Sequence, residues 1–215
     1  MIHNITKGEY LHNPCGTCST AFWKNVFVKK PDWFDDIVHE KDLTTAQREN
    51  FRIVRYFRLM HDLAKINPPS LPEDYYFRAV EIPTQLGTVA HLINRCYDNM
   101  SITTEQAEKW IKYKVFDNNL WIFIYKMSSA YPVALGIADF DGVIKEGSLE
   151  WIQTLPGERG KGLGQALVCE LLLRLAPKAD FVTVSGEVDN KTNPEGLYRK
   201  CGFIGEDIWC VLTAK

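Results

Sequence analysis

The stretch PGERGKGLGQALVCELLLRLAP, at residues 156–177, constrains the fold more than any other part of this chain. Four glycines and two cations, Arg159 and Lys161, stand before a leucine-rich segment that ends at Pro177. A helix that begins after the glycines leaves backbone N–H groups unpaired and carries the positive end of its dipole there. Alternating glycines keep side chains away from those N–H groups, whereas a plain glycine turn needs only one or two. The stretch therefore predicts an anion-binding loop between a strand and a helix.

Two common phosphate-binding motifs do not fit this loop. A nucleotide-triphosphatase loop needs serine or threonine after its lysine to hold magnesium, but Gly162 follows Lys161. A dinucleotide-binding fingerprint needs G-x-G-x-x-G, and from Gly160 the last place is taken by Gln165. The loop is therefore expected to bind some other phosphate-bearing ligand.

Hydrophobic periodicity and turn residues predict an alternation of strands and helices after residue 75. The expected order is strand, two helices, three strands, helix, strand, helix and strand. The expected ranges are 76–82, 85–97, 104–116, 120–126, 131–141, 148–155, the segment from the glycine loop to Pro177, 181–188, 193–203 and 207–214. Such an order predicts an α/β protein whose mixed sheet is covered by helices.

The N-terminal third is expected to be a separate extension. Residues 65–75 contain three prolines and are typical of a connector. The segment at 51–63 fits the periodicity of a strand and that of a helix equally well. We expect an appended, partly β segment at 1–72, packed on a main domain at 73–215.

Charge and cysteine content narrow the class of protein. A net charge of −2 gives no basic field for nucleic acid or an anionic membrane, and no apolar run is long enough to span a bilayer. The first residues lack the apolar core of a secretion signal, and six cysteines in a chain of this size suit reduced thiols. We therefore expect a cytoplasmic protein.

Cys15 and Cys18 form a C-x-x-C pair, which is found in zinc sites and in redox proteins. Zinc would need two further ligands, and no second C-x-x-C or paired histidines supply them, so no metal is expected. Ordinary thiols are the preferred interpretation, and a thiol redox protein is a rival.

The pattern Arg159-x-x-Gly162-x-Gly164 after a strand resembles the pyrophosphate-binding signature of the GNAT superfamily of acyl-CoA N-acyltransferases. The resemblance extends over about residues 76–215. EWIQTLPGERGKGLG is similar to the family's fourth strand and loop, and NPEGLYRKCGF to its late helix, which places a tyrosine just before Gly-Phe. It implies a mixed α/β (α+β) fold with a mostly antiparallel central sheet, a splayed fourth strand and flanking helices.

The resemblance also implies a coenzyme A site. Backbone groups of the fourth strand would hold the pantetheine arm, at Ile152, Gln153 and Thr154. The loop would hold the pyrophosphate, at Arg159, Gly160, Lys161, Gly162, Leu163, Gly164 and Gln165. Many members carry an asparagine seven positions before the tyrosine, whereas here Asn190 and Asn193 lie eight and five before Tyr198. Because Asn193 and Pro194 suit a helix N-cap and its first residue, Asn190 is the better candidate for a cofactor contact.

The implied chemistry is attack of a neutral amine on a thioester. Amines are mostly protonated at neutral pH, so a base is needed, and Glu150 is the candidate on the fourth strand. It is equally compatible with being a solvent-facing strand residue, and it lies two residues from the base of one well-known branch. Tyr198 is the candidate acid that protonates the leaving thiolate, and its ring is also expected to pack against Phe203.

These residues predict an N-acetyltransferase that transfers an acetyl group from acetyl-CoA to a primary amine by direct attack. The acceptor is a small molecule or a peptide, and no metal, nucleic acid or membrane is expected as a partner. The chain is expected to be a monomer or homodimer. The alternative is a non-catalytic acyl-CoA-binding sensor of the same fold, which the presence of Tyr198 and of an acid at Glu150 disfavours.

Overall fold

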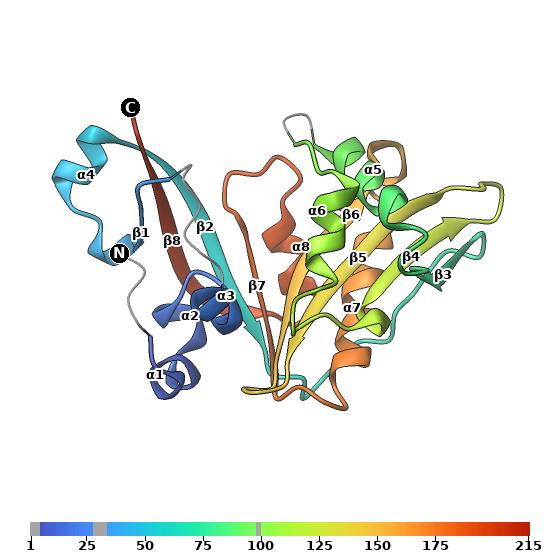
Figure 1. The fold of residues 1–215 in the computed structure, drawn as a ribbon, viewed down its shortest axis with the longest axis horizontal. Coiled ribbons are helices and arrows are strands. Elements are labelled where there is room, and N and C mark those ends of the chain that lie inside the picture. Colours follow the sequence, from blue (N-terminus) through green and yellow to red (C-terminus); the bar gives the residue numbers. More distant parts are fainter. Residues whose placement is uncertain (1–4, 28–33, 98–99) are drawn as a thin grey trace. The chain divides into compact units, whose positions relative to one another are not determined.

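The computed structural model describes residues 5–27, 34–97 and 100–215. The chain divides into two compact units, which Figure 1 shows. The first unit contains residues 1–62 and 183–215, and the second contains residues 63–182. The expected boundary near residue 72 stays a prediction, and residues 1–4 and 28–33 of the expected extension lie outside the described ranges.

The second unit is built on four antiparallel strands in the order β3-β4-β5-β6. Three of them come from apolar, β-branched segments joined by short turns, as the sequence predicts. The elements of this unit are β3 Tyr75–Ala79, α5 Leu86–Cys96, α6 Thr104–Trp110, η2 Asn118–Leu120, β4 Trp121–Lys126, β5 Pro132–Asp141, β6 Glu146–Thr154, η3 Pro156–Glu158 and α7 Leu163–Leu175.

Helices cover both faces of these four strands (Figure 1). Leu135 and Ile137 of β5 belong to the buried cluster formed with α5. Between them Gly136 faces the other way, because a Cβ atom added there would lie 3.1 Å from Leu167 and Leu171 of α7. Successive residues of a strand point to opposite faces, so α5 and α7 pack on opposite sides of the sheet.

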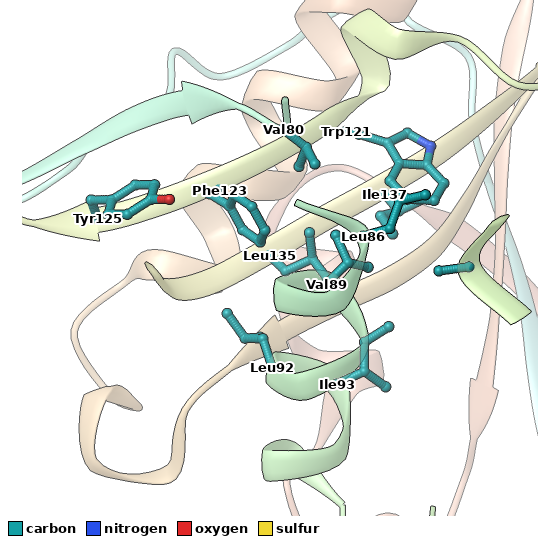
Figure 2. Packing of buried hydrophobic residues seen from close by; sticks show 11 residues of the cluster. Val80, Leu86, Val89, Leu92, Ile93, Trp121, Phe123, Tyr125, Leu135 and Ile137 are labelled. Carbon is teal, nitrogen blue, oxygen red and sulfur yellow. The ribbon is translucent and has the colours of Figure 1, made fainter. Parts of the chain in front are cut away.

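Figure 2 shows the core between α5 and the strands. Apolar side chains at positions three and four apart on α5 meet alternate residues of β4 and β5. The cluster consists of Val80, Leu86, Val89, Leu92, Ile93, Ala107, Trp121, Phe123, Tyr125, Leu135 and Ile137. It fixes α5 and α6 over the same face of the sheet that carries the partly buried Trp151 of β6.

The helix expected at 104–116 is shorter than predicted, since α6 ends at Trp110. Thr103 caps it, and Gln106 completes a capping box. Beyond Trp110 the backbone hydrogen bonds join residues three apart, as from Tyr113 N to Trp110 O. The chain therefore continues as tight turns. Val115 remains buried without being helical.

The first unit has its strands in the order β1-β8-β2-β7. The ambiguous segment at 51–63 is a strand, β2, which pairs antiparallel with β8 along almost its whole length. The elements are α1 Lys7–His12, α2 Pro14–Thr17, α3 Phe22–Phe27, β1 Asp36–His39, η1 Glu40–Asp42, α4 Thr45–Asn50, β2 Phe51–His61, β7 Phe181–Glu187, α8 Pro194–Lys200 and β8 Ile204–Ala214. β7 begins in the second unit, at Phe181.

Hydrogen bonds fasten the N-terminal helices to the strands of the first unit. The buried guanidinium of Arg58 on β2 donates to the Tyr10 hydroxyl at 2.9 Å, and Tyr10 is fully buried. The indole N–H of Trp209 on β8 donates to the Cys15 carbonyl at 2.8 Å. These helices are therefore part of the packed first unit.

The expected fold class is confirmed. The described residues contain eight strands, the pairings whose register is defined are antiparallel, and helices flank the strands. Splaying of the fourth strand, which corresponds to β6, stays a prediction. In the same residues no helix has the length and apolar character that a bilayer crossing requires.

Candidate functional site

The glycine loop lies between β6 and α7, as the sequence predicts. Gly160 and Gly162 have φ angles of 80° and 82°, in the left-handed region that favours glycine. Gly162 is the N-cap of α7, and no side chain of the described chain caps this 13-residue helix. The first N–H groups of α7 therefore lack a side-chain acceptor, and an anion fits that position.

The glycines are needed for backbone conformation more than for clearance. A Cβ atom added at Gly160 or Gly162 would have no neighbour within 4 Å. Any L-residue would nevertheless be strained at these φ angles. The open space in front of the loop leaves room for a ligand.

The two cations of the loop already have protein partners. Arg159 donates from Nε to the Thr154 carbonyl and from Nη2 to the Cys96 carbonyl, each at 3.2 Å. This guanidinium thereby links the end of β6 to the end of α5. The sequence assigned Arg159 directly to the anion, and the geometry adds a structural role.

Lys161 is held by a neighbouring acid and a phenol. Its Nζ lies 2.6 Å from Oε2 of Glu158 and 3.1 Å from the hydroxyl of Tyr75. The hydrogen bond to Glu158 raises the pKa of Lys161, and the same bond lowers the pKa of Glu158. The charge that Lys161 brings to the loop is therefore largely balanced by Glu158.

Strand β6 carries a bulge at Glu150. Trp151 pairs with Ile137 and Leu149 pairs with Ala138, so Glu150 is the extra residue. Bulges change the direction of side chains and are frequent beside active sites. The Glu150 carboxylate, which is partly exposed, accepts a hydrogen bond of 2.9 Å from the Ser148 hydroxyl.

Aromatic side chains surround the residues that follow the bulge. The Trp151 ring stacks on Trp110 with centroids 5.6 Å apart and meets the edge of Tyr97 at 6.3 Å. The side-chain amide of Gln153 donates to the Tyr97 hydroxyl at 2.9 Å. This aromatic group, Tyr97, Trp110 and Trp151, lies on the α5–α6 side of β6.

The backbone of Ile152, Gln153 and Thr154 continues the ladder with β5. Ile152 pairs with Gly136, and the Thr154 carbonyl accepts from Arg159. Binding of a pantetheine arm by these three residues stays a prediction.

Tyr198 lies on α8 in the first unit, with 7% of its surface exposed. Its ring contacts Phe203 edge-on at 5.7 Å, as expected, and Phe57 at 6.0 Å. Asn193 caps α8 by accepting from Gly196 N at 3.1 Å, with Pro194 as the first helical residue. The packing prediction and the cap prediction are confirmed, and the catalytic role of Tyr198 stays a prediction.

Asn190 is occupied in a local turn. Its Oδ1 accepts from the backbone N–H and the hydroxyl of Thr192, at 2.9 and 2.7 Å. Its side-chain amide N–H groups are compatible with a ligand contact, which stays a prediction. Tyr198 and Asn190 belong to the first unit and the glycine loop to the second, so their convergence is also a prediction.

The C-x-x-C pair is buried in the first unit, and neither thiol is in a disulfide. Among the described residues, no group of three or more histidine, cysteine or acidic side chains is placed to hold a metal ion. Burial disfavours a reactive thiolate at either position.

The chain is similar to one protein-family model and to many solved structures. A family model described as FR47-like protein matches residues 143–210, which include the bulge, the glycine loop and α8. The chain is also similar to 207 chains of solved structures. One is a GCN5-related N-acetyltransferase from Sphaerobacter thermophilus, with a TM-score of 0.69 and 16% identity over 85% of this chain. The fold of this chain is therefore similar to that of solved GCN5-related N-acetyltransferases.

Two further solved structures share this fold. A tandem GNAT protein from the clavulanic acid biosynthesis pathway has a TM-score of 0.60 and 17% identity over 79% of this chain. A GCN5-related glucosamine N-acetyltransferase region of a fungal multi-domain GH3 β-N-acetylglucosaminidase has a TM-score of 0.62 and 13% identity over 86% of this chain. This chain spans 60%, 56% and 24% of the three solved chains. Among curated protein sequences, none is significantly similar to it.

The sequence-based resemblance to the GNAT superfamily is thus confirmed in the fold. Sequence reasoning missed three neighbours of the site: Tyr75, Glu158 and Tyr97. Glu158 stands three residues before Lys161, a spacing that allows a local ion pair and could have been noticed. Tyr75 and Tyr97 reach the site through tertiary structure, and no local pattern indicates them.

Proposed function

We propose that this protein is an acyl-CoA-dependent N-acetyltransferase that transfers an acetyl group to a primary amine of a small molecule or peptide. One observation carries the proposal. A bulged strand with a carboxylate leads into an uncapped helix start flanked by left-handed glycines, within the segment that matches the FR47-like family.

The residues of the loop fit the pyrophosphate of coenzyme A. Backbone N–H groups from Gly160 to Gln165 would receive the anion, because Gly160 and Gly162 face open space and no side chain caps α7. The backbone of Ile152, Gln153 and Thr154 would align the pantetheine arm, and Asn190 would add a contact. When bound, acetyl-CoA supplies an acetyl group activated as a thioester.

The protein must then remove a proton from the amine and return one to the sulfur. Glu150 is the candidate base, because the bulge directs its carboxylate and Ser148 holds one oxygen. Tyr198 is the candidate acid for the thiolate. The aromatic group of Tyr97, Trp110 and Trp151 would exclude water from the amine, which favours its neutral form.

We propose direct transfer from acetyl-CoA to the amine, without a covalent acyl-enzyme. Cys15 and Cys18 are buried, which argues against their use as acyl carriers or redox groups. The proposed setting is the cytoplasm, with a monomer or homodimer as the acting species.

The loop assignment is tested by acetyl-CoA binding to two glycine variants. Gly162→Val strains the N-cap of α7 and should abolish the thermal shift that acetyl-CoA gives. Gly157→Val is the matched control, because Gly157 has open space and no left-handed φ. Unchanged affinity in a folded Gly162→Val protein would refute the loop assignment, and binding without turnover would favour the sensor.

A further inference from the structure

The glycine loop has little intrinsic rigidity. Lys161 is flanked by Gly160 and Gly162, the most conformationally free type of residue, and neither glycine packs against a neighbour. Restraints on this part of the loop must therefore come from the side chains next to the glycines.

Lys161 supplies such a restraint through a closed triangle of hydrogen bonds. Its ammonium donates to Glu158 and to the Tyr75 hydroxyl, and that hydroxyl donates to the same Oε2 of Glu158 at 2.6 Å. Tyr75 is itself held in place, because it is 7% exposed, lies on β3 and pairs with Lys126 of β4.

We propose that Tyr75 and Glu158 are positioning residues that hold Lys161, and thereby fix the glycine loop in the conformation that binds the pyrophosphate. The inference rests on the proposed acyl-CoA function. In this arrangement the backbone N–H groups receive the anion, while the Lys161 side chain ties the loop to the sheet.

The charge balance of the triangle supports this role. Nζ of Lys161 lies 2.6 Å from Oε2 of Glu158, and each group shifts the pKa of the other so that its ionised form is favoured. The positive charge of Lys161 is therefore balanced within the protein. A loss of Lys161 should consequently act through loop order more than through Coulombic attraction of the ligand.

Loop order is measured first without ligand, by the NMR order parameters of the backbone amides at 160–165. Lys161→Met, Glu158→Gln and Tyr75→Phe should each lower the order parameters there and leave those of α5 unchanged. Lys126→Met is the matched control. Both lysines lie over the Tyr75 ring, at 5.9 and 5.8 Å from its centroid, but Lys126 is outside the triangle. Unchanged order parameters of the loop in all three variants would overturn the proposal.

Calorimetric titration with acetyl-CoA then tests the link to binding. Each single variant should weaken affinity about threefold to tenfold, and pairs of variants should cost less than the sum of their separate effects. In turnover assays the loss should fall on KM for acetyl-CoA and not on kcat.

A charge exchange separates positioning from direct contact with phosphate. The double variant E158K/K161E rebuilds the pair in reverse and should recover most of the affinity that K161E loses. If the double variant binds as weakly as K161E, or if Glu158→Gln binds more tightly than the unaltered protein, Lys161 acts on the ligand directly and the proposal is wrong. If the unaltered protein binds no acetyl-CoA, the proposed function fails. The measurement of loop order without ligand still tests the triangle in that case.

Discussion

The hydroxyl of Ser148 donates a hydrogen bond of 2.9 Å to Oε1 of Glu150 across the bulge in β6. This contact fixes the direction of the only β6 carboxylate that stands outside the paired register. It links the strand irregularity to the proton transfer proposed for this protein.

Replacing Glu150 tests that link. Glu150→Gln keeps the shape and the contact with Ser148 but removes the base, so kcat/KM should fall by roughly a hundredfold or more. The fall should be largest on the acidic limb of the pH–rate profile, where the amine is protonated. Ser148→Ala should give a smaller loss, because only the orientation of Glu150 is relaxed. A profile in Glu150→Gln that matches the unaltered protein would move the base role to water or another residue.

Tyr198→Phe separates the catalytic role of Tyr198 from its packing role. The ring that contacts Phe57 and Phe203 is kept and only the proton is removed, so acetyl-CoA affinity should be nearly unchanged. We expect kcat to fall by roughly ten- to a thousandfold, at or below the usual range for a lost general acid. Tyr198→Ala, by contrast, should destabilise the fold by about 3 kcal/mol through the cavity it leaves. Full activity of Tyr198→Phe with the natural acceptor would remove the catalytic assignment.

The cap of α8 predicts an order of stability among Asn193 variants. Asn193 has φ 48° and caps the helix, so Asn193→Ala loses the hydrogen bond to Gly196 N and strains the backbone as well. The expected loss in the free energy of unfolding is about 2 kcal/mol. Asn193→Gly should lose about 1 kcal/mol less, because glycine adopts this φ freely. Urea unfolding measures both, and equal stability of the two variants would contradict the strain.

The Lys161–Glu158 pair predicts a pH window. The folded pKa of Glu158 is below its usual 4.5, so its contribution to stability is present above that value and is lost as pH falls through the folded pKa. The folded pKa of Lys161 is above 10.5, so its contribution is present below that value and is lost as pH rises through the folded pKa. The difference in unfolding free energy between the protein and Glu158→Gln should be level from about pH 5 to about pH 10 and shrink outside it. A difference that persists unchanged at pH 3 would refute the pairing in solution.

Much of the fold follows from local patterns in the sequence. LWIFIYK and YPVALGIADFD are apolar enough on both faces to be buried strands, and β4 and β5 confirm them. The helix at α6 was predicted too long, because the partly buried Trp110 and the buried Val115 can face the core whether the chain between them is helical or turned. The strand-or-helix ambiguity of 51–63 is settled by pairing of β2 with β8, a partner about 150 residues away.

The candidate site was predicted less completely. Gly160 and Gly162 were correctly placed at the start of a helix, but their left-handed φ angles were not predicted. The partners of Lys161 and Arg159 were not predicted, because they are distant in the sequence. Tyr75 is 86 residues from Lys161, and the Cys96 carbonyl is 63 residues from Arg159. The bulge that singles out Glu150 depends on register with β5 and has no local signature.

The most direct test of the proposed function is amine-dependent release of free thiol from acetyl-CoA. The purified protein is incubated with acetyl-CoA and a panel of primary amines, including polyamines, amino sugars and peptides with free N-termini, and products are identified by mass. We predict stoichiometric free coenzyme A and N-acetylated amine with at least one acceptor, and at least tenfold slower formation with Tyr198→Phe. The contrary result would be saturable binding of acetyl-CoA with no thiol release and no N-acetylated product for any amine in the panel. That result would contradict the proposed acetyltransferase function and identify an acyl-CoA-binding protein instead.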